Sequence, residues 1–139
     1  LMYHAEAIAL LEKVGMAEQA ERHCAVLAYG DLKRMELAIA LSHDPVLLLM
    51  DEPTAGMAPK ERVALMQLTA NIVRNEQVSV LFTEHDMDVV FAHAHRIMVL
   101  NRGKLIAEGN ATEIRNSPLV QEVYLGGGTL FEAEQDAHA

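Results

Sequence analysis

The sequence predicts an α/β fold in which helices flank a mostly parallel sheet, followed by a C-terminal hairpin and short helices. Two short apolar runs, residues 46–50 and 78–82, have the composition of strands buried on both faces of a parallel sheet. Between them, apolar residues recur at helical spacing from Pro59 to about Arg74. A strand, a helix and a strand in this order form a right-handed crossover, and ligands bind such sheets at the carboxyl ends of the strands.

Two helices are expected before the first strand. The first contains Ala5, Ile8 and Leu11 at spacing three and ends near Gly15. The second runs from about residue 31 to 42 and stops before Asp44-Pro45, because the residue before a proline disfavours the helical conformation. Two expected apolar faces are Leu32, Met35, Ala38 and Ile39 on this second helix and Val63, Met66, Ala70 and Val73 on the helix after Pro59.

The remaining elements are short. Asp86 is suited to cap a helix that reaches about residue 94, and residues 96–100 and 104–108 are expected to form a hairpin. Asn110 and Glu113 have the spacing of a capping box. Ser117-Pro118 opens a last helix that Gly126 is expected to close, and residues 127–139 are expected to be a flexible tail.

Composition narrows the function classes. The 139 residues carry a formal net charge of −9, which argues against a nucleic-acid partner because phosphate backbones attract clustered Lys and Arg. Cys24 is the one cysteine, so an internal disulfide is excluded and a reducing compartment is favoured. The longest uninterrupted apolar run, residues 46–50, is far shorter than the ~20 residues of a membrane span.

Three short segments carry candidate chemistry. Asp51-Glu52 follows the first expected strand and His85 follows the second, so both lie where the fold places a ligand. Each has a structural alternative: two acids can cap a turn, and a histidine after a strand is more often structural. A glycine loop at residues 27–31 precedes a helix, whose free N–H groups form an anion site, although a plain glycine turn capped by Asp31 is the alternative.

Together and in order, these segments resemble the ATP-binding cassette (ABC) ATPases, which are P-loop NTPases. Residues 27–31 match the signature motif, 46–52 the strand with its Asp-Glu motif, 54–59 the D-loop, and His85 the switch histidine. The likeness extends from Ala5 to about Gly126 and is greatest to the ATP-binding subunits of branched-chain amino-acid importers. It implies the end of a helical subdomain with the signature motif and helix at residues 1–45, and a RecA-like α/β portion at 46–126.

The resemblance implies roles for single residues. Asp51 would support Mg²⁺ through water, Glu52 would act as the general base on the attacking water, and His85 would contact the γ-phosphate of ATP. Ala28, Tyr29, Gly30 and Asp31 would contact the ATP held by a second subunit, and Gly56 of the D-loop would line the dimer seam. The implied partners are a second ABC ATPase subunit, transmembrane permease subunits and, indirectly, a solute-binding protein. The implied location is cytoplasmic, peripheral on the inner face of the cell membrane.

The sequence also departs from the family. The commonest signature is Leu-Ser-Gly-Gly-Gln, and here Ala28 and Asp31 replace its serine and glutamine, which predicts slower turnover. The phosphate-binding loop Gly-x-x-x-x-Gly-Lys-Ser/Thr does not occur in residues 1–139, because Gly103-Lys104 is followed by Leu105. We therefore expect a C-terminal fragment that binds ATP poorly and hydrolyses none by itself, with an apolar sheet edge left open.

Three other functions compete with an importer ATPase. A metal-dependent hydrolase would use Glu84, His85, Asp86, Asp88, His93 and His95, which are close in sequence but lack metal-ligand spacing. An ABC ATPase that acts on DNA or ribosomes is disfavoured by the acidic charge. An inactive dimerisation remnant would also fit a chain that lacks the phosphate-binding loop.

Overall fold

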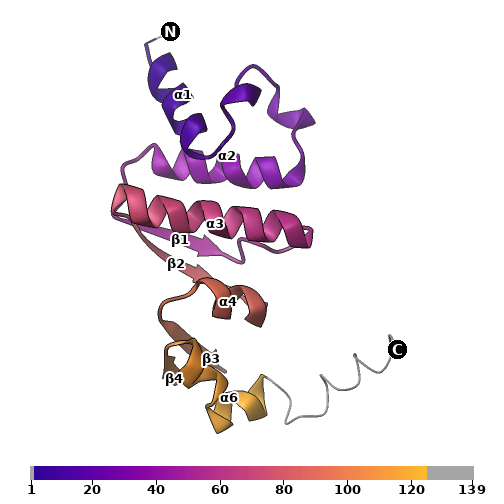
Figure 1. Cartoon of the computed structure of the whole chain (residues 1–139), viewed down its shortest axis with the longest axis vertical. Helices are drawn as coiled ribbons and strands as arrows, with labels where there is room; N and C mark the ends of the chain where they lie inside the picture. The colour runs from indigo at the N-terminus through magenta and orange to yellow at the C-terminus, as the bar shows by residue number, and fades with distance from the viewer. Residues whose placement is uncertain (1, 125–139) are drawn as a thin grey trace, which may run out of the picture. The chain divides into compact units, whose positions relative to one another are not determined.

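The computed structural model describes residues 2–124 and divides into two compact units (Figure 1). The first unit is Leu1–Val89, and the second begins at Val90. The helix end expected at Gly126 and the tail expected at residues 127–139 lie outside the described residues. The domain boundary expected between residues 45 and 46 falls inside the first unit and stays a prediction.

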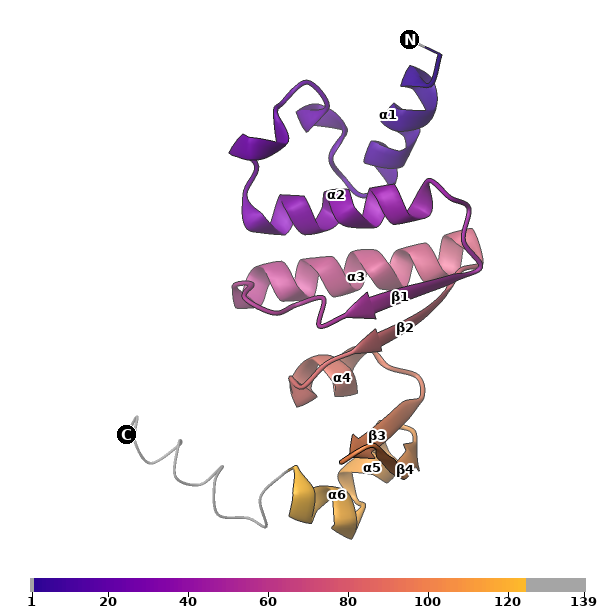
Figure 2. The same cartoon turned by 180° about the vertical axis from the view of Figure 1, so that it is seen from behind.

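The helices of the first unit confirm the expected order. They are α1 (His4–Lys13), α2 (Tyr29–Leu41) and α3 (Pro59–Glu76), with short 3-10 turns η1 (Ala17–Gln19) and η2 (Cys24–Val26) between α1 and α2. Gly15 follows α1 with a φ of +70°, a left-handed conformation that glycine adopts without steric cost. Figures 1 and 2 show α2 and α3 side by side, with α3 lying over the strands.

A two-stranded parallel sheet lies beside α3. Strand β1 (Leu47–Asp51) pairs with β2 (Ser79–Thr83), and α3 is the crossover between them, as expected. Each strand begins and ends one residue later than expected. The register places Asp51 opposite Thr83, so both strands end at the same edge.

The core of the first unit lies between one face of this sheet and the helices. Its buried apolar residues are Val14, Met16, Leu37, Ala38, Leu41, Leu48, Ile72 and Val78. The two expected helix faces were partly wrong, since Ile39 is 59% exposed and Val63 is 51% exposed. Neighbouring positions, such as Leu41 on α2 and Leu65 on α3, point to the core instead.

The expectation that both strands are buried on both faces was wrong. Leu48 is 5% exposed, whereas its neighbours Leu47 and Leu49 are 48% and 72% exposed. Successive side chains of a strand point to opposite faces, and α2 and α3 pack on the face that carries Leu48 and Val80. The opposite face, which also carries Leu81, is therefore open to solvent in this chain.

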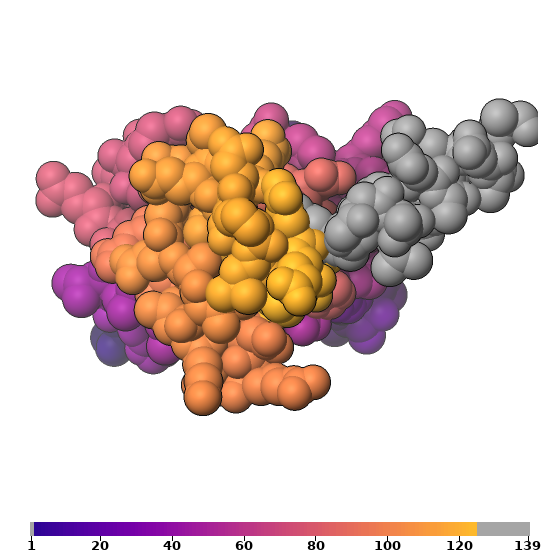
Figure 3. Space-filling model, turned by 90° about the horizontal axis from the view of Figure 1, so that it is seen from below, coloured from indigo at the N-terminus to yellow at the C-terminus, as the bar shows by residue number. Residues whose placement is uncertain are grey.

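The second unit contains the expected hairpin. Strands β3 (Ile97–Asn101) and β4 (Lys104–Gly109) are antiparallel, and the turn residues Arg102 and Gly103 both have positive φ, as a tight hairpin turn requires. Figure 3 shows the orange hairpin region in contact with the yellow C-terminal helices of this unit. Those helices are α5 (Ala111–Arg115) and α6 (Pro118–Val123).

Helix caps in and near the second unit confirm three sequence predictions. Asp86 Oδ1 accepts from the N–H groups of the first turn of α4 (Met87–His93), at 3.1 and 3.3 Å. The amide side chain of Asn110 and the carboxylate of Glu113 bond each other's backbone N–H, at 3.0 and 2.8 Å. The Ser117 hydroxyl accepts from a backbone N–H of α6. No helix in the described part of the chain is long and apolar enough to cross a membrane.

One pair of substitutions tests the one-sided burial of β1. Leu48→Ala leaves a cavity in the core and should lower the free energy of unfolding by about 2–5 kcal/mol. Leu49→Ala removes the same atoms from a 72% exposed site and should change it by about 0.5 kcal/mol or less. Urea unfolding followed by circular dichroism measures both, and equal losses would contradict the open face.

Candidate functional site

The carboxyl ends of β1 and β2 bring the first group of candidate residues together. Asp51 ends β1, and its carboxylate accepts a hydrogen bond from the Thr83 hydroxyl on β2. The N–H of Glu52 donates to the backbone oxygen of Thr83 at 3.0 Å and to its hydroxyl oxygen at 3.1 Å. Thr83 therefore holds both acidic residues at the end of the sheet, and both are exposed.

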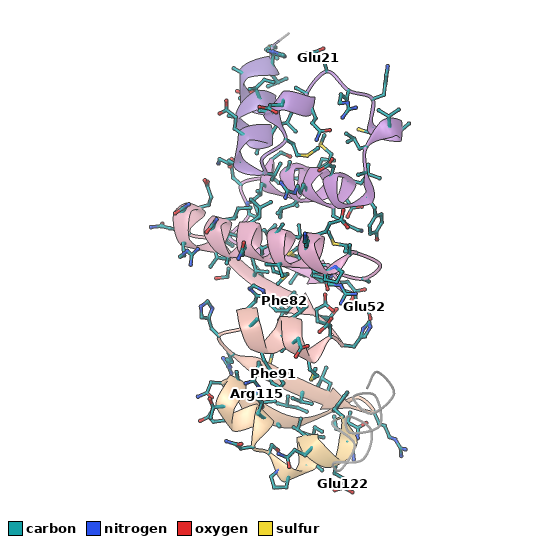
Figure 4. All side chains as sticks on the ribbon, turned by 45° about the vertical axis from the view of Figure 1, so that its right-hand side comes forward. Glu21, Glu52, Phe82, Phe91, Arg115 and Glu122 are labelled. Carbon is teal, nitrogen blue, oxygen red and sulfur yellow. The ribbon has the colours of Figure 1, made fainter. Side chains whose placement is uncertain are left out.

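Glu52 and His85 face each other across the two loops. Glu52 Oε1 lies 3.4 Å from His85 Nδ1, and the two side chains are 50% and 75% exposed. The φ of Glu52 is +43°, a left-handed conformation that is uncommon for a residue with a Cβ. The chain turns away from the end of β1 at Glu52, which is labelled in Figure 4. Strained residues of this kind often occur at functional sites.

The second group lies at the start of α2. The helix begins at Tyr29, two residues before the expected start, and Ala28 is its N-cap with a side chain that cannot accept a hydrogen bond. The structural alternative for Asp31 as a cap is therefore wrong. Its carboxylate instead accepts from Gln19 Nε2 at 3.2 Å. The first N–H groups of a helix lack intrahelical partners, so this end remains a candidate anion site.

Gly30 is buried at this helix end because α3 approaches it closely. A Cβ on Gly30 would lie 3.1 Å from Glu61 Oε1 and 3.6 Å from the methyl carbon of Met57. Glu61 in turn accepts from the N–H of Ala58 at 3.1 Å, which caps the first turn of α3. The absence of a side chain at Gly30 thus permits the contact between the two helix starts.

Gly56 belongs to the same group. Its φ is +73°, and a Cβ built there would lie 3.8 Å from the ring of Tyr29. Gly56, expected in the D-loop, and Tyr29, expected in the signature motif, are therefore neighbours. Lys33 lies 5.4 Å from the centre of the Tyr29 ring, and its hydrogen bond to Glu36 raises the pKa of its ammonium group.

The structure thus forms two groups from the predicted residues. Asp51, Glu52 and His85 form one, and Ala28, Tyr29, Gly30, Asp31 and Gly56 form the other. Within residues 2–124, no hydrogen bond or ion pair joins the two groups.

Three residues that support these groups were not predicted from the sequence. Thr83 holds Asp51 and Glu52, and Thr54 is 2% exposed with its hydroxyl bonded to Glu84 Oε1 at 2.6 Å. Glu61 fills the space beside Gly30. The register of β1 and β2 would have indicated Thr83, since it ends the second strand opposite Asp51. No comparable signal exists for Glu61.

Among the described residues, no cluster of metal-ligating side chains supports the alternative of a metal-dependent hydrolase. In the part of the chain that the structure describes, no three His, Cys, Asp or Glu side chains lie close enough together to hold a metal ion. Asp86, one of the six residues considered, is engaged by Arg62 at 2.6 Å and caps α4.

Comparisons with known sequences agree on one family. Residues 2–55 match the family described as "ABC transporter", and residues 104–129 match "Branched-chain amino acid ATP-binding cassette transporter". The "High-affinity branched-chain amino acid transport ATP-binding protein LivG" of Salmonella typhimurium is 42% identical over 116 residues, covering 84% of this chain and 46% of LivG. BraF of Pseudomonas aeruginosa, described in the same words, is 40% identical with the same coverage. The chain spans about half the length of these relatives.

Solved structures show the same likeness. The ADP conformation of MJ1267, "an ATP-binding cassette of an ABC transporter", superposes with a TM-score of 0.80 at 30% identity, covering 88% of this chain and 49% of MJ1267. The cbiO1 protein of Clostridium perfringens has a TM-score of 0.77 at 23% identity, covering 97% of this chain and 53% of that one. At that identity it supports the fold alone.

The fold and the arrangement of the two strand ends define the class of a P-loop NTPase, here an ABC-type nucleotide-binding domain. The chain belongs to the family of ABC transporter ATP-binding proteins. Its sequence likeness to LivG and BraF is to the branched-chain amino-acid group of that family.

A double-mutant cycle tests the contact between Gly30 and Glu61. Alanine in place of a helical glycine ordinarily stabilises by about 0.5–1 kcal/mol. Gly30→Ala should lose this gain, because its Cβ crowds Glu61 Oε1 at 3.1 Å. In a Glu61→Ala background the gain should return, which gives a coupling energy of about 1 kcal/mol. Urea unfolding of the four proteins measures it, and an equal effect of Gly30→Ala in both backgrounds would show that the helix starts are not in contact.

Proposed function

We propose that this chain supplies the hydrolytic part of an ATP-hydrolysing importer subunit for branched-chain amino acids or similar small solutes. The observation that carries the proposal is the group formed by Asp51, Glu52 and His85 at the carboxyl ends of two parallel strands. The names of LivG and BraF support the solute class. In the intact subunit, a segment upstream of Leu1 would provide the phosphate-binding loop that residues 1–139 lack.

Asp51 is suited to a magnesium site. Its carboxylate is exposed at the strand end and oriented by the Thr83 hydroxyl, and oxygen atoms are the ligands that Mg²⁺ prefers in proteins. When bound, Mg²⁺ would neutralise charge on the phosphates of ATP. The Thr83 hydroxyl bonds Oδ1 of Asp51, which leaves Oδ2 for a water of the ion's shell, so the carboxylate fits Mg²⁺ held through water.

Glu52 is placed to act as the general base. Its carboxylate projects beyond the end of β1 and is half exposed, so an attacking water can reach it. His85 lies on the far side of that carboxylate, 3.4 Å away, where its imidazole can donate to Glu52 or to a phosphate oxygen. Glu52 would take the proton from water, while His85 would hold the γ-phosphate in line with it.

The second group would serve a second subunit. In a head-to-tail dimer, the start of α2 with Tyr29 and Gly30 would contact the ATP held by the partner's phosphate-binding loop, and Gly56 would lie at the seam. The partners would be that second ATPase subunit, membrane permease subunits and, indirectly, a solute-binding protein. Such a subunit would lie on the cytoplasmic face of the membrane and bind it through the permease.

Glu52→Gln in the intact subunit tests the assignment of the base. The amide keeps the size of the carboxylate but cannot accept the proton, so ATP hydrolysis should fall by about 10²–10⁴-fold while ATP binding persists. Glu76→Gln is a matched control, because it makes the same chemical change at the far end of α3, where Glu76 pairs with Lys13. Phosphate release and calorimetric ATP binding are the measurements. Lost binding, or unchanged turnover, would show that Glu52 is structural.

The unusual signature residues permit a second test. Ala28→Ser adds a hydroxyl at the N-cap of α2, and Asp31→Gln removes a negative charge from its first turn. The added hydroxyl can donate to a phosphate oxygen and the lost charge no longer repels it, so the double variant should raise the turnover of the intact subunit several-fold, by roughly 1 kcal/mol of added stabilisation. A steady-state ATPase assay measures this. An unchanged rate would mean that neither position limits turnover.

A further inference from the structure

We propose that Glu84 and Arg62 are positioning residues that anchor the segment carrying His85 to the D-loop, so that the two move together. The catalytic meaning of this coupling rests on the function proposed above. The coupling itself rests on contacts within the first unit, between residues 54–62 and residues 84–89. None of these contacts involves Glu52 or His85 directly.

The first anchor joins Glu84 to Thr54. Glu84 Oε1 accepts from the N–H of Thr54 at 3.0 Å and from its hydroxyl at 2.6 Å. Thr54 is 2% exposed, so these bonds are shielded from competing water. Hydrogen bonds to an ionised carboxylate are roughly twice as strong as neutral ones. The residue before His85 is thereby fixed to the first residue of the D-loop.

The second anchor joins Arg62 to both segments. Arg62 Nε donates to the backbone oxygen of Met57 at 2.9 Å, and its Nη1 donates to Asp86 Oδ2 at 2.6 Å. The other carboxylate oxygen of Asp86 accepts from the N–H groups of Asp88 and Val89 at the start of α4. One guanidinium thus connects Met57 of the D-loop to Asp86, the residue after His85. A lysine has a single nitrogen and cannot span both acceptors in this way.

His85 lies between the two anchored residues. Its own side chain is 75% exposed and meets Glu52 at 3.4 Å, so little packing holds the imidazole in place. Its position must therefore come from its backbone, which Glu84 and Asp86 fix on either side. A shift of the D-loop would carry both anchors, and with them the imidazole.

This arrangement suggests how a partner subunit would influence hydrolysis. Gly56 lies in the D-loop between Thr54 and Met57, the two residues that the anchors hold. Contact of a partner with Gly56 would thus be transmitted to His85 over a few residues. Pairing of the two subunits would thus also place the His85 imidazole beside Glu52.

The first test measures the coupling in the chain itself, without ATP. In Arg62→Gln, NMR should show a shift of the His85 imidazole resonances and an increase of about tenfold in hydrogen exchange at the Thr54 amide, which belongs to the other anchor. Arg62→Lys should show the same changes, because it keeps the charge and loses one contact. Arg74→Gln is the matched control on α3, where the arginine bonds Asn71, and should leave both signals unchanged.

The outcomes decide the proposal. Unchanged His85 and Thr54 signals in Arg62→Gln, with the hairpin β3–β4 spectrum intact, would overturn it. If Arg62→Gln unfolds the first unit, Thr54→Val tests the other anchor. It removes the hydroxyl bond to Glu84 and should shift His85, whereas Thr54→Ser keeps that hydroxyl and should not. An equal response of the valine and serine variants would also overturn the proposal.

The second test uses the intact subunit. Arg62→Gln should lower kcat by about 10–100-fold at unchanged KM for ATP, because small displacements of a catalytic group cost rate rather than binding. Arg74→Gln should retain the parental kcat. Coupled NMR signals in a subunit that hydrolyses no ATP would refute the proposed function and leave the anchors standing. An active subunit with unchanged kcat in Arg62→Gln would refute the role of the anchors in catalysis.

Discussion

The parallel register of β1 and β2 is the constraint on which the rest of this chain depends. Because Asp51 pairs with Thr83, both strands end at one edge, and the loops that follow start side by side. The Thr83 hydroxyl donates to Asp51 and accepts a hydrogen bond from the N–H of Glu52. Glu52 itself has a left-handed backbone conformation. His85 reaches Glu52 for the same reason. A slip of one residue in the register would move every side chain of a strand to the other face of the sheet. Asp51, Glu52 and His85 would then no longer lie together.

The same two strands have one covered face and one exposed face. One face of the sheet carries Leu48 and packs against α2 and α3, whereas the other exposes Leu47, Leu49 and Leu81. Exposed apolar surface is costly in water, and large patches of it often mark interaction sites. The chain spans 46% of the length of LivG.

The sequence was sufficient for the order of elements and for the residues at the strand ends. Apolar runs fixed the strands to within one residue, and the caps at Asp86, Asn110 and Ser117 follow from local hydrogen bonding that a short segment determines by itself. Which side chains are buried was harder to predict from the sequence. Whether Leu49 or Ile39 is covered depends on which elements pack against it, and a periodic pattern does not contain that information.

Supporting residues were hardest to predict, because their partners are distant in sequence. Glu84 and Thr54 are 30 residues apart, and Arg62 and Asp86 are 24 apart. Arg62 stands among ordinary charged positions of an exposed helix turn, where an arginine is usually a solvated residue. Only the crossover of α3 between the two strands brings these groups together.

The most direct measurement of the central claim is binding and hydrolysis of Mg-ATP by this chain, with and without an added upstream segment that carries a phosphate-binding loop. The assignment of the site predicts weak binding and no hydrolysis by the chain alone, and ATPase activity once the segment is present. Tight ATP binding or hydrolysis by residues 1–139 alone would contradict it, because the nucleotide would then occupy a site other than the one that Asp51, Glu52 and His85 define.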